Sequence, residues 1–395
     1  MKNIRIISSK SDAHRALICG ALSKDPCRVI YSGTSRDIEA TEACLGALRE
    51  GRREMYCGES GSTLRFLLPL MGALGHEAEF HMEGRLPQRP LSPLYEELEA
   101  HGCTLSPQGQ VPLTIEGQLQ PGTYRLPGNV SSQYISGLLF ALPLLEGDSE
   151  ILLTSTLEST PYVDMTIKTL SLFGIRIEKT SGGYAARGNQ AYTAPKEYMV
   201  EGDWSNACFF LAAGAFTEGG ITVSGLNLDS LQGDKAILDI LQEMGATVST
   251  GPAGITVQPG EGLCGITIDA SQIPDMAPIL SVLGLAASGT TEIRNAERLR
   301  IKESDRLRAI TKTLTALGGQ VEELPDGLRI EGGRRLTGGT IDSHNDHRIA
   351  MMAAIASLIC DGKVTIGHAE AVEKSYPDFF DVLREAGLDE NVERK

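Results

Sequence analysis

The chain has 395 residues, more than one ordinary hydrophobic core organises, so we expect two domains of roughly 200 residues each. Its formal net charge of −15 argues against non-specific binding of nucleic acid, which needs a basic surface. The longest apolar runs, such as residues 349–360, are shorter than the roughly 18 residues of a membrane span, and residues 1–8 lack the apolar core of a secretory signal. We therefore expect a cytoplasmic protein without membrane or nucleic-acid partners, whose acidic ligands bind at local clusters of cations.

Motifs of several common chemistries are absent. None of the eight cysteines pairs in a CxxC spacing, and neither an HExxH motif nor a paired Cys/His spacing suggests a metal site. No GxxxxGK[ST] phosphate-binding loop occurs, since residues 58–62 lack its lysine, and no GxSxG motif marks a hydrolase serine. We expect buried, reduced thiols and a protein that uses neither a metal ion nor an organic cofactor.

The first informative stretch is polar and cationic. Residues 9–15 include Lys10 and Arg15, and an almost wholly apolar run, residues 16–22, follows directly. Polar residues before an apolar run predict the N-terminus of a buried helix. Such an end carries unpaired N–H groups and a partial positive charge, so it favours carboxylate or phosphate.

The same change from polar to apolar recurs five more times along the chain, at residues 58–65, 129–133, 203–206, 274–278 and 345–348. The second to sixth junctions follow one another at a nearly constant spacing. Their period, roughly 70 residues, is too long for a solenoid repeat and indicates a sizeable unit. The pattern within each unit reads strand, helix, two strands, helix.

The first and last units are incomplete. A glycine ends the first helix of each unit, and the next junction begins about 30 residues after Gly102, Gly174 and Gly245. The junction after Gly51 begins much sooner. A strand pair expected near residues 51–57 therefore lacks about 20 residues by this spacing. The sixth unit stops soon after Gly387, and only one short strand, residues 4–7, precedes the first junction.

A capped core helix explains any one junction, because Ser, Asp and Asn are ordinary helix caps. Six are harder to explain in that way, because several carry cations such as Arg65 and Arg348 in their first turns. The fourth and fifth junctions carry Asp203 and Asp275 instead, where an acidic side chain also complements the helix dipole.

Two further segments are rich in charge. If residues 298–306 form a helix, Lys302 and Arg306 lie on one face beside Glu303. This face is either part of a functional site or a solvated helix surface with ion pairs. Residues 85–90 form a proline-bounded stretch with two arginines, which suits either a surface loop or bidentate binding of an anion.

Five of these motifs together resemble the EPSP synthase family, from about Ile4 to Phe380. They are Lys10-Ser11 with Arg15, residues 61–65, 131–133, 302–306 and 345–348. The resemblance implies an α/β (α+β) fold, a two-domain inside-out α/β barrel whose domains each contain three β-α-β-α-β-β repeats, the first one shortened. Residues 9–201 would form the N-terminal domain, residues 1–8 with 202–395 the C-terminal domain, and the active site would lie in the cleft between them.

The resemblance also implies an activity. The family transfers the enolpyruvyl group of phosphoenolpyruvate to the 5-hydroxyl of shikimate 3-phosphate by addition–elimination and releases phosphate, a step of the shikimate pathway to the aromatic amino acids. Both substrates are strongly anionic, which suits cations gathered at helix N-termini. The implied partners are these two small molecules alone, and we expect a monomer.

Site residues are carried over by matching position. Asp275 matches the family's base, Glu303 its proton donor, and Lys10 contacts both substrates. Residues expected to bind shikimate 3-phosphate are Lys10, Ser11, Arg15, Ser131, Ser132, Gln133, Ser159, Tyr162, Asp275, Arg298 and Lys302. Residues expected to bind phosphoenolpyruvate are Lys10, Gly61, Arg65, Arg85, Gln133, Arg306, His347, Arg348 and Lys374.

The sequence departs from the family pattern in three ways. Glu59 and Arg298 stand where many members carry Asn, and Glu59 puts a carboxylate near an anion site. The third departure is the absent strand pair after Gly51 together with the absent leading strand before Ile4, which would leave a sheet edge of the C-terminal domain unpaired.

Two alternatives remain open. One is the sister enzyme acting on UDP-N-acetylglucosamine, which normally carries a loop cysteine as proton donor and lacks the Lys-Ser and His-Arg motifs present here. The other is a catalytically degenerate anion-binding homologue, which the absent segments favour and the complete set of charged site residues opposes.

Overall fold

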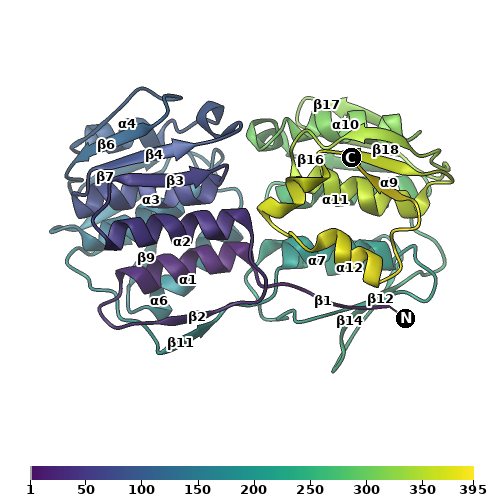
Figure 1. The fold of residues 1–395 in the computed structure, drawn as a ribbon, viewed down its shortest axis with the longest axis horizontal. Coiled ribbons are helices and arrows are strands. Elements are labelled where there is room, and N and C mark those ends of the chain that lie inside the picture. The colour runs from purple at the N-terminus through teal and green to yellow at the C-terminus, as the bar shows by residue number, and fades with distance from the viewer. Residues whose placement is uncertain (1) are drawn as a thin grey trace. The chain divides into compact units, whose positions relative to one another are not determined.

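A computed structural model describes residues 2–395. The chain divides into two compact units, which we call the N-terminal unit, Lys10–Val200, and the C-terminal unit, made of the residues up to Ser9 and Glu201–Lys395. These bounds differ by one residue at each end from the expected domains. Each unit contains three β-sheets and buried helices (Figure 1).

Two of the sheets in the N-terminal unit have four strands with the same topology, in the orders β3-β4-β6-β5 and β7-β8-β10-β9. The first two strands of each order run parallel, and the other two form an antiparallel hairpin. The third sheet is a parallel pair, β11 with β2. The strands are β2 (Arg28–Ile30), β3 (Glu54–Gly58), β4 (Ala78–Met82), β5 (Cys103–Leu105), β6 (Leu113–Gly117), β7 (Thr123–Leu126), β8 (Ser149–Leu153), β9 (Ile177–Thr180), β10 (Gly183–Ala186) and β11 (Glu197–Met199).

The helices of this unit bury apolar faces against the sheets and one another. They are α1 (Lys10–Leu22), α2 (Arg36–Arg49), α3 (Gly61–Leu74), α4 (Leu94–Ala100), α5 (Ser132–Ala141) and α6 (Thr160–Leu172), with the 3-10 turns η1 (Leu86–Gln88) and η2 (Leu142–Leu144). Helices α3 and α5 are buried almost throughout and pack against each other closely. A glycine permits this approach, since a Cβ at Gly137 would collide with the carbonyl oxygen of Arg65.

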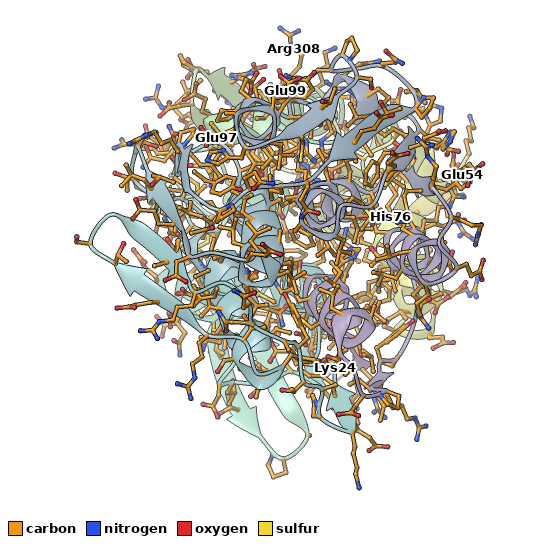
Figure 2. All side chains as sticks on the ribbon, turned by 90° about the vertical axis from the view of Figure 1, so that its left-hand side faces the viewer. Lys24, Glu54, His76, Glu97, Glu99 and Arg308 are labelled. Atoms are coloured by element: carbon orange, nitrogen blue, oxygen red, sulfur yellow. The ribbon has the colours of Figure 1, made fainter. Side chains whose placement is uncertain are left out.

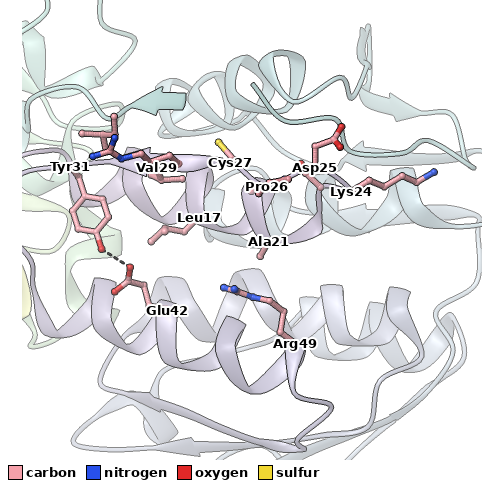
Figure 3. Close-up of a pocket in the computed structure, with 14 residues that line it drawn as sticks. Leu17, Ala21, Lys24, Asp25, Pro26, Cys27, Val29, Tyr31, Glu42 and Arg49 are labelled. Atoms are coloured by element: carbon pink, nitrogen blue, oxygen red, sulfur yellow. Dashed lines mark hydrogen bonds between the residues drawn. The ribbon is translucent and has the colours of Figure 1, made fainter. Parts of the chain in front are cut away.

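Within residues 2–395, the sheet that contains β2 has no hairpin. Residues 50–53 join α2 to β3 and form no strand. Strands β4 and β8 each pair with a hairpin strand, whereas β2 pairs only with β11 within the described chain. A groove of about 680 Å³ lies along α1, β2 and α2, and Tyr31 donates a 2.6 Å hydrogen bond to Glu42 in it (Figure 3).

The C-terminal unit repeats the four-stranded topology twice, in the orders β1-β12-β14-β13 and β15-β16-β18-β17, and adds a parallel sheet, β19-β20-β21. Its strands are β1 (Lys2–Arg5), β12 (Ile221–Ser224), β13 (Thr247–Gly251), β14 (Gly254–Gln258), β15 (Thr267–Asp269), β16 (Thr290–Arg294), β17 (Gln320–Leu324), β18 (Gly327–Glu331), β19 (Gly339–Asp342), β20 (Val364–Gly367) and β21 (Val392–Arg394).

One apolar core fills this unit, and α7, α9 and α11 run through it. The helices are α7 (Trp204–Gly214), α8 (Ile237–Glu243), α9 (Ala277–Ala286), α10 (Arg306–Ala316), α11 (His347–Ala356) and α12 (Phe379–Glu385). Short 3-10 helices connect them: η3 (Gly233–Ala236), η4 (Pro274–Met276), η5 (Glu297–Ile301), η6 (Ser357–Ile359) and η7 (Ala369–Lys374).

The expectation of an unpaired sheet edge needs correction. The N-terminal residues form β1, which pairs in parallel with β12 of the C-terminal unit. The last residues of the chain form a strand that the sequence pattern did not predict, β21, and it pairs along β20 opposite β19. The two ends of the chain therefore both contribute strands to this unit (Figure 1).

The prediction of a helix that carries both Lys302 and Arg306 on one face is also wrong. Residues 302–304 form a bend, Asp305 is the N-cap, and α10 begins only at Arg306. The reason is the cap, because the Asp305 carboxylate accepts the backbone N–H of Arg308 at 3.2 Å and ends the irregular segment there.

The outer surface is charged. In the N-terminal unit Lys24, Glu54 and Glu99 are exposed on different elements (Figure 2). Among residues 2–395, no helix is both long and apolar enough to span a membrane.

Candidate active site

All six polar-to-apolar junctions are helix N-termini, as predicted. Helices α1, α3 and α5 begin there in the N-terminal unit, and α7, η4 with α9, and α11 in the C-terminal unit. Side-chain caps are provided by Ser60 on α3, Ser131 on α5, Asp203 on α7 and Asp346 on α11. Asp203 accepts the N–H of Asn206 at 2.7 Å, which is the ordinary capping role for an acidic residue.

The start of α1 carries three of the predicted substrate residues. Lys10 forms a 2.7 Å ion pair with Asp37, in the first turn of α2. Arg15 is buried and donates at 2.5 Å to the Ser11 carbonyl and at 2.8 Å to the Tyr162 carbonyl. Burial lowers the pKa of Arg15 to about 10, so the guanidinium is still charged at neutral pH.

The starts of α3 and α5 meet through polar side chains. Arg65 donates to the Gly61 carbonyl and to the Gln133 amide oxygen, both at 3.4 Å, and Gln133 donates to the Ser62 hydroxyl at 2.9 Å. A Cβ on Gly61 would collide with the Arg65 guanidinium and would lie 2.9 Å from Nη1 of Arg89. Two guanidiniums therefore lie beside the N-terminus of α3, which is a favourable place for an anion.

The other predicted residues of this unit are at helix ends or in a loop. Ser131 caps α5 and Ser132 is its first residue. Ser159 is buried, in the left-handed conformation (φ 52°), at the residue before α6, and Tyr162 lies in the first turn of that helix. Arg85 is exposed and directly precedes η1.

In the C-terminal unit, Arg306 binds three carboxylates. Its side chain is 2% exposed and lies 2.7 Å from Asp275, 2.7 Å from Glu303 and 2.8 Å from Asp346. Asp346 also accepts the Ser304 hydroxyl at 2.9 Å while it caps α11. Asp346 therefore contacts both Ser304 and Arg306, and these contacts hold residues 302–305 against the start of α11.

Asp275 receives two further cations. Arg348 lies 3.4 Å and Lys302 3.8 Å from its carboxylate, and Arg348 also donates to its carbonyl oxygen at 3.1 Å. Burial alone would raise the pKa of Asp275, but Arg348, Lys302 and Arg306 together hold it well below its usual range. Asp275 is therefore a carboxylate throughout the physiological pH range.

Four further predicted site residues belong to the C-terminal unit. Burial lowers the pKa of Lys302 to about 8, with Asp275 opposing the shift. Arg298 donates to the Ser271 carbonyl at 2.7 Å, and Lys374 donates to the Asn345 carbonyl at 2.6 Å, one residue before the cap of α11. His347 is buried as the first residue of that helix.

Three residues that contact the predicted site residues were not identified as such from the sequence. Asp37 pairs with Lys10, Thr166 accepts a 2.8 Å hydrogen bond from Arg15, and Asp346 binds Arg306. Asp346 lies within a motif already singled out, so its capping role had a signal. Asp37 and Thr166 are distant in the sequence from their partners and had none. Across residues 2–395, no group of three His, Cys, Asp or Glu side chains is arranged to hold a metal ion.

The chain is a mixed α/β protein of two units, with cations at helix N-termini and one carboxylate surrounded by cations. These features define an enzyme that acts on small anionic molecules. A model of one family, EPSP synthase (3-phosphoshikimate 1-carboxyvinyltransferase), matches residues 49–383. The chain belongs to this family.

Individual relatives agree with that assignment over nearly the whole chain. A 3-phosphoshikimate 1-carboxyvinyltransferase from Clostridium acetobutylicum is 45% identical over 414 positions, covering 98% of this chain and 95% of the relative. One from Clostridioides difficile is 42% identical, covering 96% of this chain and 93% of the relative. The structure of EPSP synthase from Acinetobacter baumannii is similar with a TM-score of 0.79 at 25% identity, covering 98% and 96% of the two chains.

Proposed function

We propose that the protein transfers the enolpyruvyl group of phosphoenolpyruvate to the 5-hydroxyl of shikimate 3-phosphate and releases phosphate, as a step in the biosynthesis of aromatic amino acids. Family membership over nearly the whole chain supports this activity. The structural observation that carries it is the cluster in which Asp275 contacts Lys302, Arg306 and Arg348. This cluster combines a carboxylate that can accept a proton with cations that can hold two anionic substrates.

Shikimate 3-phosphate carries a carboxylate and a phosphate, and the proposal gives each its own group. Ser11 and Arg15 at the start of α1 bind the carboxylate. The hydroxyls of Ser131, Ser132 and Ser159, at the starts of α5 and α6, bind the phosphate together with Lys302. Gln133 and Tyr162 contact the ring, and Arg298 contacts the substrate. Hydroxyl and N–H groups at three helix ends support this arrangement, because helix N-termini favour anions.

Phosphoenolpyruvate also carries a carboxylate and a phosphate. Lys10, Gly61, Arg65, Arg85 and Gln133 bind it from the N-terminal unit. Arg306, His347, Arg348 and Lys374 bind it from the C-terminal unit. Charge-assisted hydrogen bonds from arginine are the strongest polar contacts available for such a ligand.

In the addition step Asp275 takes the proton of the 5-hydroxyl while the oxygen forms a bond to C2 of phosphoenolpyruvate. Glu303, which becomes protonated when the charge of the bound substrates offsets Arg306, gives a proton to C3. In the elimination step Glu303 takes a proton back from C3 and the bond between C2 and the phosphate oxygen breaks, which restores the double bond. The proton held by Asp275 leaves with the phosphate. The low pKa of Asp275 makes it a weak base before substrates bind. Bound anions offset the surrounding cations, so we expect its pKa to rise when both substrates are present.

We further propose that the six sheets are six copies of one repeated unit, three in each domain, in the family's inside-out α/β arrangement. The matching strand orders of the four complete sheets support the repeat. The two-stranded and three-stranded sheets would be the shortened first and last copies.

The test is an assay of the purified protein with shikimate 3-phosphate and phosphoenolpyruvate, in which phosphate release and the enolpyruvyl product are both measured. We expect turnover with this pair and none when UDP-N-acetylglucosamine replaces shikimate 3-phosphate. Turnover with the nucleotide sugar would support the sister activity, which the comparisons do not favour. Binding of shikimate 3-phosphate without turnover would instead support a degenerate homologue.

A further inference from the structure

Two buried hydrogen-bond networks start from consecutive residues of α1. The first begins at His14, whose Nδ1 lies 2.7 Å from the Thr41 hydroxyl on α2. Thr41 lies 2.6 Å from the Thr63 hydroxyl on α3, and Thr63 donates at 2.7 Å to Ser60, the cap of α3. We call this chain of side chains the His14 network. It joins α1, α2 and α3, which lie side by side (Figure 1).

The second network begins at Arg15 and runs in another direction. Its Nε donates at 2.8 Å to the Thr166 hydroxyl on α6, which lies 2.8 Å from the Ser136 hydroxyl on α5. We call this the Arg15 network. The same guanidinium also donates to the Tyr162 carbonyl, so α1 is tied to the first two turns of α6.

Both networks are buried, and they are neutral apart from the guanidinium. His14, Thr41, Thr63 and Ser60 are each at most 1% exposed, and Thr166 and Ser136 are completely buried. Burial lowers the pKa of His14 well below its usual value, and Lys10 and Arg15 lower it further. The imidazole is therefore neutral. Its Nε2 has no hydrogen-bond partner within the described chain, so its one hydrogen bond, to Thr41, sets its orientation.

The two networks reach different sets of proposed substrate residues. The His14 network connects the helix of Lys10 with the cap next to Gly61, and both of these residues belong to the proposed phosphoenolpyruvate site. The Arg15 network connects the helix of Ser11 with α5 and α6, which carry the proposed serines for the phosphate of shikimate 3-phosphate.

We propose that the two networks position the two substrates separately: the His14 network aligns Lys10 with Gly61 for phosphoenolpyruvate, and the Arg15 network aligns Ser11 and Arg15 with the phosphate-binding serines for shikimate 3-phosphate. The proposal rests on the proposed function. Thr41, Thr63, His14, Thr166 and Ser136 act through other residues and are positioning residues. A buried hydroxyl whose partner is removed favours a shifted arrangement in which it is satisfied, so loss of one link moves a helix end.

The test compares three buried threonine-to-valine variants. Thr41→Val breaks the His14 network, and we expect the KM for phosphoenolpyruvate to rise about fivefold or more and the KM for shikimate 3-phosphate to change less than about twofold. Thr166→Val breaks the Arg15 network and reverses the pattern. Thr169→Val is the matched control, because this buried threonine on α6 bonds, among the residues that the structure describes, only to the Met165 carbonyl of its own helix. We expect it to leave both KM values unchanged.

Thermal unfolding of the three variants separates positioning from stability. We expect similar losses of Tm in all three, with only the two network variants changed in KM, and Thr41→Ser restores the KM for phosphoenolpyruvate because it keeps the hydroxyl. Equal rises in both KM values for Thr41→Val and Thr166→Val, or KM changes in Thr169→Val that match theirs, would overturn the proposal. If Thr41→Val does not fold, His14→Phe keeps a ring and removes the same link. Absence of turnover in the unsubstituted protein would instead refute the proposed function itself.

Discussion

Asp275 shows how neighbours decide the chemistry of a single residue. Three cations in direct ion-pair contact stabilise its carboxylate, and their combined charge outweighs the desolvation that would otherwise favour the protonated form. The proposed base is therefore ionised before substrates bind, and we expect it to become a stronger base when bound anions offset those cations.

Replacement of Asp275 by alanine tests its role. We expect Asp275→Ala to abolish turnover, because it removes the carboxylate proposed to accept the 5-hydroxyl proton, while the affinity for shikimate 3-phosphate stays within about tenfold. Single-turnover kinetics and equilibrium binding measure the two quantities. Asp378→Ala removes an exposed carboxylate of the same unit as a control. Near-normal turnover of Asp275→Ala would show that the base is another residue.

Lys302 gives a prediction for the effect of pH. Its pKa of about 8 means that the ammonium loses its charge as pH rises through 8, so the attraction for the phosphate of shikimate 3-phosphate falls. We expect kcat/KM for this substrate to decline above pH 8 and the decline to disappear in Lys302→Arg, which stays charged. A pH–rate profile from pH 6 to 10 measures this. An unchanged decline in the Arg variant would assign the titration to another group.

Asp234 gives a prediction for stability. It is buried, its Oδ2 accepts the Ser205 hydroxyl and its Oδ1 has no partner in residues 2–395. Burial raises its pKa from 3.8 to about 6, against the opposing charge of Arg348. The folded state therefore holds this proton more tightly than the unfolded chain, and the free energy of unfolding falls as pH rises from about 4 to about 6.

Asp234→Asn removes this contribution. Because a shift of about two pKa units corresponds to about 3 kcal/mol, we expect the variant to gain up to that much stability relative to the unsubstituted protein between pH 4 and pH 7. Urea unfolding at several pH values measures the difference, with the exposed carboxylate of Asp229, replaced by Asn, as control. Parallel stability curves for Asp234→Asn and the unsubstituted protein would contradict the assignment.

Helices are the elements that organise the site, and their N-termini were the most predictable part of it. Capping residues followed by an apolar run form a local signal, and all six such junctions begin helices. Lys302 to Asp305 was predicted less well, because Asp305 caps α10 and excludes the preceding residues from the helix. Strand β21 was missed because three residues near the chain end carry too little pattern to indicate a strand.

Close packing of two helices gives a prediction at this scale. A methyl group at position 137 would meet the Arg65 carbonyl oxygen, and backbone on both sides cannot yield easily. We expect Gly137→Ala to destabilise the protein by about 1–3 kcal/mol and to reduce activity, because Arg65 moves. In contrast, a Cβ at Gly46 within α2 meets nothing within 4 Å, so Gly46→Ala should be neutral or stabilising by up to about 1 kcal/mol. Denaturant unfolding of both variants checks the pair, and equal effects would contradict the packing argument.

At the scale of the whole molecule, the chain is a mixed α/β protein of two units that matches EPSP synthase structures. Its acidic composition and its anionic substrates are compatible because the cations of the site are concentrated at helix ends. A groove lies along α1, β2 and α2 (Figure 3). Buried polar networks join these helices to their neighbours.

The sequence by itself determined the helix ends and the family, because each of these depends on residues close together in the chain or on motifs in a fixed order. Only the tertiary structure decided which charges meet. Lys10 with Asp37, Arg306 with Asp346 and the two networks from α1 all join side chains of different helices that are distant in the sequence. Local pattern does not encode such pairings, since they depend on how helices pack and on which polar groups are buried together.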